Sequence, residues 1–140
     1  MKVVLDTNVW IGFFRNPVQK DAFETRMHRP LLFMSSVVAM ELFTGCRTLR
    51  RQKDLSNLLK PFEKAGRILT PDHACFREAG VVLAALANDG VGAAHLRQIV
   101  NDVLIAVTAA RSGAVLVTAN ASDFSRIAEH TRLRWMTPLI

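Results

Sequence analysis

The sequence predicts an α/β fold: a single domain with a short, mainly parallel sheet of four to five strands flanked by helices. Apolar runs at 3–5 and 114–118 lack the alternation of a half-exposed strand, which indicates strands buried on both faces. Segments of helical length separate these runs, and strands alternating with helices are typical of a parallel sheet. The 140 residues can bury a core and contain no Pro-, Gly- or Ser-rich linker, so we expect residues 1–140 to form one domain.

The first half of the chain is predicted to hold two strands and four helices, delimited by capping and helix-breaking residues. Pro17 and Pro30 end the helices before them, because proline cannot continue a helix. Ser35 and Ser36 offer an N-cap to the third helix, and Pro61 is expected to kink or break the fourth. The predicted elements are a strand at 3–5, helices at 9–15 and 18–28, a strand at 31–34, and helices at 37–42 and 55–65.

The second half is predicted to continue the alternation of strands and helices. Asn101 offers a cap at which a long helical segment can break and restart, and Gly113 is placed to end that segment. Ser122 or Asp123 is expected to cap the last helix. The predicted elements are a strand at 67–69, a helix from 70–72 to 87, a turn at 88–90, a helical segment at 93–112, a strand at 114–118, a short helix after 122 and an edge strand at 133–136.

The composition favours a polyanionic partner and a reducing compartment. Lys and Arg exceed Asp and Glu by 18 to 12, which favours nucleic acid first and an acidic protein second. Cys46 and Cys75 match no zinc or redox spacing, so we expect free thiols. Asp6 interrupts the amino-terminal apolar stretch, and no apolar run approaches the roughly 18 residues of a membrane span. We therefore expect a cytoplasmic protein with no membrane association.

Four carboxylates are predicted to meet at one edge of the sheet. Asp6 follows the first buried strand, and Asp123 lies in the loop that leaves the strand at 114–118. Glu41 lies in the helix that follows a third strand, and Asp102 joins the group if its helix begins near Asn101. The carboxyl ends of parallel strands are where ligands bind in such folds.

A divalent cation would resolve the repulsion between these carboxylates. Oxygen ligands without His or Cys suit Mg²⁺ or Mn²⁺. One or two such ions activate water and stabilise the leaving oxygen of a phosphodiester. Hydroxyl and amide side chains that do not bind the metal themselves can orient the carboxylates by hydrogen bonds. The candidates for this role are Thr7, Asn8, Thr118 and Asn120. An acidic metal site on a basic α/β domain indicates a nuclease.

Four segments resemble, in order, the motifs of the PIN-domain ribonucleases, and among them the VapC-like toxins of type II toxin–antitoxin systems. The segments are VLDTNV at 4–9, SVVAMEL at 36–42, NDVLIA at 101–106 and VTANASDF at 117–124. The resemblance implies that the catalytic, metal-binding acids are Asp6, Glu41, Asp102 and Asp123, supported by Thr7, Asn8, Thr118 and Asn120. It also implies a Mg²⁺- or Mn²⁺-dependent endoribonuclease that acts on RNA as a toxin. The expected partners are a second copy of the chain, as a homodimer, and a cognate antitoxin whose C-terminal segment occludes the site.

Each acid also has a simpler structural interpretation. Asp6 or Asp123 could serve only as a helix cap. Glu41 could pair with Arg47 or another arginine. Asp102 could be a first-turn residue that the helix dipole favours, a role compatible with metal binding.

Other residues allow alternative roles in the same way. Arg47, Arg50 and Arg51 are predicted to share a helical face, where they either contact RNA phosphates or are simply solvated. Trp10, Phe13 and Phe14 favour a core or dimer-interface role over base stacking. The four histidines show no pairing in the sequence, which gives metal-independent His/His ribonuclease chemistry little support.

The sequence leaves two rival functions open. A phosphatase of the haloacid dehalogenase type also places an Asp after its first strand, but it needs a second Asp where this chain has Asn8, and a later lysine that is not found. A catalytically weak PIN-like module could bind RNA or a partner through a vestigial metal site. No motif specifies the RNA class, the cleavage site, the antitoxin or the number of metal ions.

Overall fold

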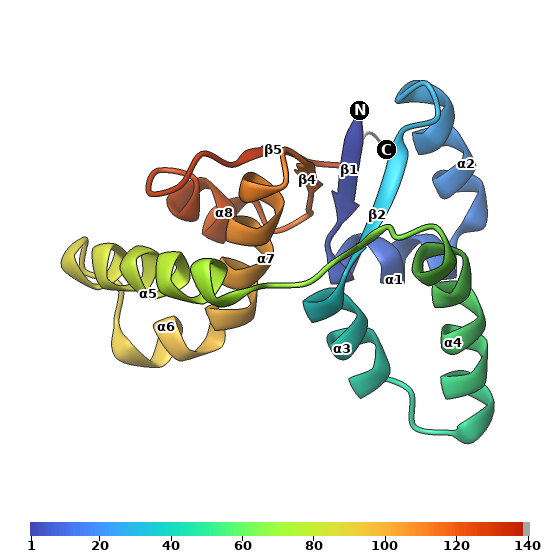
Figure 1. Cartoon of the computed structure of the whole chain (residues 1–140), viewed down its shortest axis with the longest axis horizontal. Coiled ribbons are helices and arrows are strands. Elements are labelled where there is room, and N and C mark those ends of the chain that lie inside the picture. The colour runs from blue at the N-terminus through green and yellow to red at the C-terminus, as the bar shows by residue number, and fades with distance from the viewer. Residues whose placement is uncertain (139–140) are drawn as a thin grey trace.

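The computed structural model describes residues 1–138, which form a five-stranded sheet covered by helices (Figure 1). The strands are β1 (Lys2–Leu5), β2 (Leu31–Ser35), β3 (Ile68–Leu69), β4 (Val115–Val117) and β5 (Arg134–Met136). Their order is β3-β2-β1-β4-β5, and each neighbouring pair is parallel. The structure therefore confirms the predicted parallel α/β sheet, with β5 at its edge.

Eight helices connect and cover the strands. They are α1 (Thr7–Arg15), α2 (Pro17–Arg26), α3 (Ser36–Thr44), α4 (Leu49–Lys64), α5 (His73–Asn88), α6 (Ala93–Gln98), α7 (Val100–Arg111) and α8 (Ala121–Ile127). In Figure 1, α5 to α8 gather to the left of β1 and β2, while α2 and α4 lie to their right. No helix among residues 1–138 is both long and apolar enough to cross a membrane.

The limits of α4 differ from the prediction. The helix begins at Leu49 rather than at residue 55, because the Thr48 side chain accepts a hydrogen bond from the Arg51 amide at 3.2 Å and caps it. Pro61 lies inside α4 without ending it. Arg47 precedes the cap, so the predicted helical face shared with Arg50 and Arg51 is wrong for Arg47.

Two predicted caps are also wrong. The helical segment breaks at Ile99, which lies between α6 and α7, whereas Asn101 is already inside α7. The cap of α8 is Asn120, whose side-chain oxygen accepts the Asp123 amide at 3.3 Å. Asp123 is therefore in the first turn of α8, which excludes the interpretation that it is only a helix cap.

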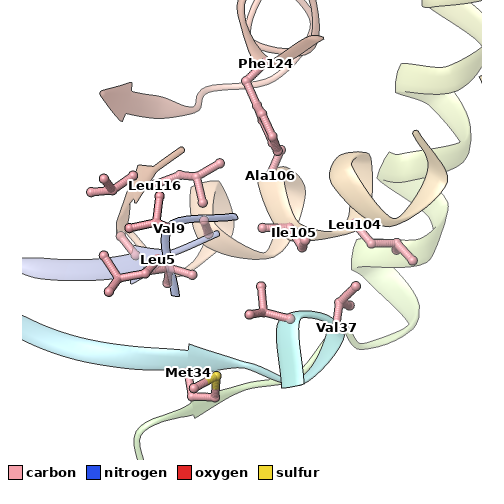
Figure 2. Packing of buried hydrophobic residues seen from close by; sticks show 14 of the residues in the cluster. Leu5, Val9, Met34, Val37, Leu104, Ile105, Ala106, Leu116 and Phe124 are labelled. Carbon is pink, nitrogen blue, oxygen red and sulfur yellow. The ribbon is translucent and has the colours of Figure 1, made fainter. Parts of the chain in front are cut away.

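The core fixes the ends of the central strands against α7. Seven consecutive residues of α7, 103–109, are buried, as expected for a helix with apolar residues on all sides. Leu5 of β1, Leu116 of β4 and Ile105 of α7 belong to one hydrophobic core (Figure 2). Burying each such side chain contributes roughly 1.5–3 kcal/mol, so this core holds β4 against α7.

The strand order reverses at β1, which lies between β2 and β4. Connections leave β1 and β4 in opposite directions at such a point, and the crevice there is the usual ligand site of an open α/β sheet. Leu5 is in register with Val117, and the Asp6 amide donates to the Val117 carbonyl at 2.9 Å. The residues that follow β1 and β4 are thus brought side by side.

Candidate active site

Asp6 is the most buried charged residue at this crevice, with 3% of its surface exposed. Its Oδ1 accepts the Thr7 amide at 2.8 Å, and its Oδ2 accepts Asn8 Nδ2 at 3.1 Å and Thr118 Oγ1 at 2.7 Å. Burial raises the pKa of Asp6, and the Glu41 charge adds to this, against the lowering effect of the three hydrogen bonds. Asp6 also caps α1. The capping role that was the simpler interpretation of Asp6 is therefore present, and it is compatible with a role in the site.

Glu41 is held by the residue that follows Asp6. Thr7 Oγ1 donates to Glu41 Oε1 at 2.7 Å and links α1 to α3. Among residues 1–138, the ion pairs do not include Glu41. The alternative that Glu41 pairs with an arginine is therefore wrong.

The loop after β4 carries the predicted polar supports. Thr118 is fully buried, and its hydroxyl both donates to Asp6 and accepts the Asn120 amide at 3.0 Å. The Asn8 side-chain oxygen accepts the Ala119 amide at 3.0 Å. These bonds join the turn after β1 to the turn after β4, and Asn8 and Thr118 both donate to the Asp6 carboxylate.

Asn120 positions the fourth acid. Its Nδ2 donates to Asp123 Oδ2 at 3.0 Å while its oxygen caps α8. Burial alone would raise the pKa of Asp123, but hydrogen bonds from Asn120 and His95, with the charges of His95 and Arg126, outweigh burial and lower it. Asp123 is therefore an ionised group that two neighbours hold in place.

Asp102 lies in the first turn of α7. Burial raises its pKa to about 7, followed by the charges of Asp6, Glu41 and Asp123. No group among residues 1–138 donates a hydrogen bond to its carboxylate. An acid that faces three carboxylates without a donor must hold a proton or share a cation, and an all-oxygen set suits Mg²⁺ or Mn²⁺.

The four carboxylates are more widely spaced than the ligands of a closed metal site. Within residues 1–138, one group of acids and histidines has ligand atoms that all lie within 4.8 Å of one another, and it consists of Asp89, Glu129 and His130. That group lies where α5 ends and beyond the end of α8, and two of its members are exposed. The predicted acids would therefore have to move closer together to bind one ion directly.

His95 belongs to this site although the sequence did not indicate it. Its Nε2 donates to Asp123 Oδ1 at 2.7 Å, and elsewhere His130 pairs with Asp89 at 2.6 Å. Both partners are carboxylates, so neither contact forms the histidine pair that metal-independent His/His chemistry would need. His95 and Asp123 are 28 positions apart, and no spacing rule joins them, since their contact depends on the break between α6 and α7.

A groove of about 790 Å³ extends from Glu41 between α1, α3 and α4. Its walls include Phe14, which is 49% exposed, and its charged members include Arg15 and Arg51. Trp10 is in the core, as is Phe13, but Phe14 is available to a ligand. Of the three predicted RNA-binding arginines, Arg51 lines the groove, while Arg47 and Arg50 are exposed outside it.

The chain is similar over most of its length to proteins of one family. The model of the PIN domain matches residues 3–130. The tRNA(fMet)-specific endonuclease VapC of Shigella flexneri is 26% identical over 127 residues, which covers 91% of this chain and 92% of that protein.

Solved structures lead to the same family. VapBC-1 from nontypeable Haemophilus influenzae superposes with a TM-score of 0.72 at 25% identity, with 98% of each chain covered. DNA-bound VapBC from Salmonella typhimurium gives a TM-score of 0.70 at 27% identity, with the same coverage. The match of the family model over residues 3–130 shows that this chain belongs to the PIN domain family.

Proposed function

We propose that this chain is a divalent-metal-dependent endoribonuclease that acts as the toxin of a toxin–antitoxin pair. The observation that carries the proposal is the position of Asp102 in the first turn of α7, where partial burial and the charges of Asp6, Glu41 and Asp123 raise its pKa to about 7. The repulsion between such carboxylates is relieved when a cation binds them. Acids with shifted pKa values in a crevice are typical of functional sites. The similarity to a VapC endonuclease supports RNA as the substrate, and transfer RNA is the class to test first.

Asp6 and Asp102 would be the principal ligands of Mg²⁺ or Mn²⁺, with Glu41 and Asp123 completing the site. When bound, the ion would activate water and stabilise the leaving oxygen. The protein's own groups prepare the site: Thr7, Asn8 and Thr118 fix the oxygens of Asp6 and Glu41. Asp102 would bind the ion as a carboxylate, and hydrolysis supplied by a metal-activated water would leave a 5′-phosphate and a 3′-hydroxyl.

The decisive experiment is cleavage of transfer RNA by the purified chain in Mg²⁺, in EDTA and with Asp6→Asn. We expect cleavage in Mg²⁺ alone, with product ends carrying 5′-phosphate. Asp89→Asn is the matched control, because Asp89 also accepts a short hydrogen bond but contacts none of the four acids; it should cleave as the wild type does. Full activity in EDTA or with Asp6→Asn would refute the mechanism.

A cognate antitoxin and a second copy of the chain are the proposed protein partners. The similar structures are VapBC complexes, which supports an antitoxin that occludes the site. Expression of the chain should arrest growth, and co-expression of the protein encoded by the adjoining reading frame should restore it; failure of both would contradict the toxin role. Sedimentation should give about twice the chain mass of 15.6 kDa, whereas a monomer would contradict the dimer.

The two rival functions differ from the proposed one in the residue they need at position 8 and in metal binding. A phosphatase of the haloacid dehalogenase type needs an acid at position 8, where Asn8 instead braces the turns after β1 and β4. Trapping with a phosphate analogue should therefore yield no phosphoaspartate at Asp6. A vestigial module should bind no Mn²⁺ in calorimetry, whereas the proposed enzyme should bind it.

A further inference from the structure

The Asp123 carboxylate is held by donors from two separate parts of the chain. Asn120, three residues earlier, donates to Oδ2 at 3.0 Å, and His95 of α6 donates to Oδ1 at 2.7 Å. Asp6, by comparison, is almost fully buried and has three donors. Asp123 has 16% of its side chain exposed and lies on a short helix, so Asn120 alone leaves it freer to change rotamer.

We propose that His95 is a positioning residue, whose Nε2 holds the Asp123 carboxylate toward Asp102 and so sets the affinity of this edge for a divalent cation. The inference rests on the proposed function. Neighbours of this kind orient ligands in metal sites, and their loss typically costs 10–100-fold in metal affinity or activity. The His95 charge also acts to lower the pKa of Asp102, in addition to the direct contact of His95 with Asp123.

A purely structural role for the pair, as a tie between α6 and α8, has less support. α6 packs against α5 and α7, and Leu96 packs against the hydrophobic core. The Leu96 amide bonds the Gly92 carbonyl at 3.0 Å, and the Ile99 amide bonds the His95 carbonyl at 3.1 Å. The backbone bonds form α6 itself, and its packing on α5, α7 and the core through Leu96 places it, while the His95 side chain is 40% exposed. The imidazole can therefore hold the Asp123 carboxylate by its hydrogen bond without contributing to the packing of α6.

The test compares His95→Ala and His95→Gln with His130→Ala. The last is a matched control, because His130 makes a similar pair with Asp89, at 2.6 Å, outside the proposed site. Mn²⁺ affinity is measured by calorimetry, cleavage by kcat and KM, and folding by Tm in EDTA. We expect His95→Ala to lose 10–100-fold in Mn²⁺ affinity and in kcat, with KM for RNA and Tm nearly unchanged. His95→Gln should recover most of the Mn²⁺ affinity and most of kcat, because its side-chain amide can donate to the same Asp123 oxygen. His130→Ala should match the wild type in both quantities.

Three results would overturn the inference: unchanged Mn²⁺ affinity in His95→Ala, a fall in Tm without a loss of affinity, or a rise in KM at constant kcat. Crystal structures of wild type and His95→Ala in EDTA give a readout independent of activity. We expect the Asp123 carboxylate to change rotamer in the variant, and an unmoved carboxylate would count against positioning. If the wild type itself neither binds Mn²⁺ nor cleaves RNA, the proposed function fails, and these structures still decide whether His95 positions Asp123.

Discussion

Replacing Asp102 by Asn should stabilise the metal-free protein at alkaline pH. The Asp102 carboxylate faces three other acids and has no donor among residues 1–138, so ionising it in the fold is costly. An amide of the same shape removes that charge. Asp6 is a less suitable site for this experiment, because its carboxylate accepts three hydrogen bonds and an amide would turn one acceptor into a donor.

The expected gain is worked from the pKa of Asp102, which rises from 3.8 to about 7 in the fold. A shift of about three units corresponds to about 4 kcal/mol, which we reduce to about 2 kcal/mol because the side chain is partly exposed to solvent. The folded state holds this proton more tightly than the unfolded chain. The wild type is therefore favoured at acidic pH and loses stability as the pH rises from about 4 to about 7.

Urea denaturation in EDTA measures the effect at several pH values. At about pH 8 the Asp102→Asn variant should be about 2 kcal/mol more stable, or roughly 6 °C higher in Tm, and this advantage should vanish near pH 4. Asp21→Asn, at an exposed position on α2, is the control and should follow the wild-type pH dependence. Addition of Mn²⁺ should stabilise the wild type more than the variant. A variant that is less stable than wild type at about pH 8 in EDTA would refute the reasoning.

Three further substitutions test the supports of the site and its RNA contacts. Thr118→Val removes a fully buried hydroxyl that serves Asp6 and Asn120; urea denaturation should show a loss of about 1–3 kcal/mol, and an unchanged midpoint would contradict the role. Asn120→Ala removes the α8 cap and one donor to Asp123, so it should cost about 1 kcal/mol of stability and about 10–100-fold in cleavage. Arg51→Ala should weaken RNA binding and lower its log–log salt slope by about one, whereas an unaltered slope would place Arg51 outside the interface.

The placement of Asp6 beside Thr118 was predictable because it follows from the sheet alone. Two buried apolar runs predict parallel strands, and such strands end at the same edge. The register of Leu5 with Val117 then brings the next residues together. The acids gathered there were found because a carboxylate amid apolar residues is costly wherever it occurs.

The helix caps and the His95–Asp123 contact were not predictable from the sequence, because several neighbouring side chains could have made the same hydrogen bonds. Asn120, Ser122 and Asp123 can all cap a helix, and the tertiary position of Asp123 against His95 leaves the cap to Asn120. Thr48 capped α4 earlier than the apolar pattern indicated. The His95 contact needs the exact angle between α6 and α7, which no residue pattern encodes.

The most direct test of the central claim is the position of a Mn²⁺ ion in an anomalous difference map of crystals grown or soaked with that ion. We predict a peak at the carboxyl ends of β1 and β4, bounded by the carboxylates of Asp6 and Asp102. A map with no peak there, and with Mn²⁺ instead at Asp89, Glu129 and His130, would contradict the account.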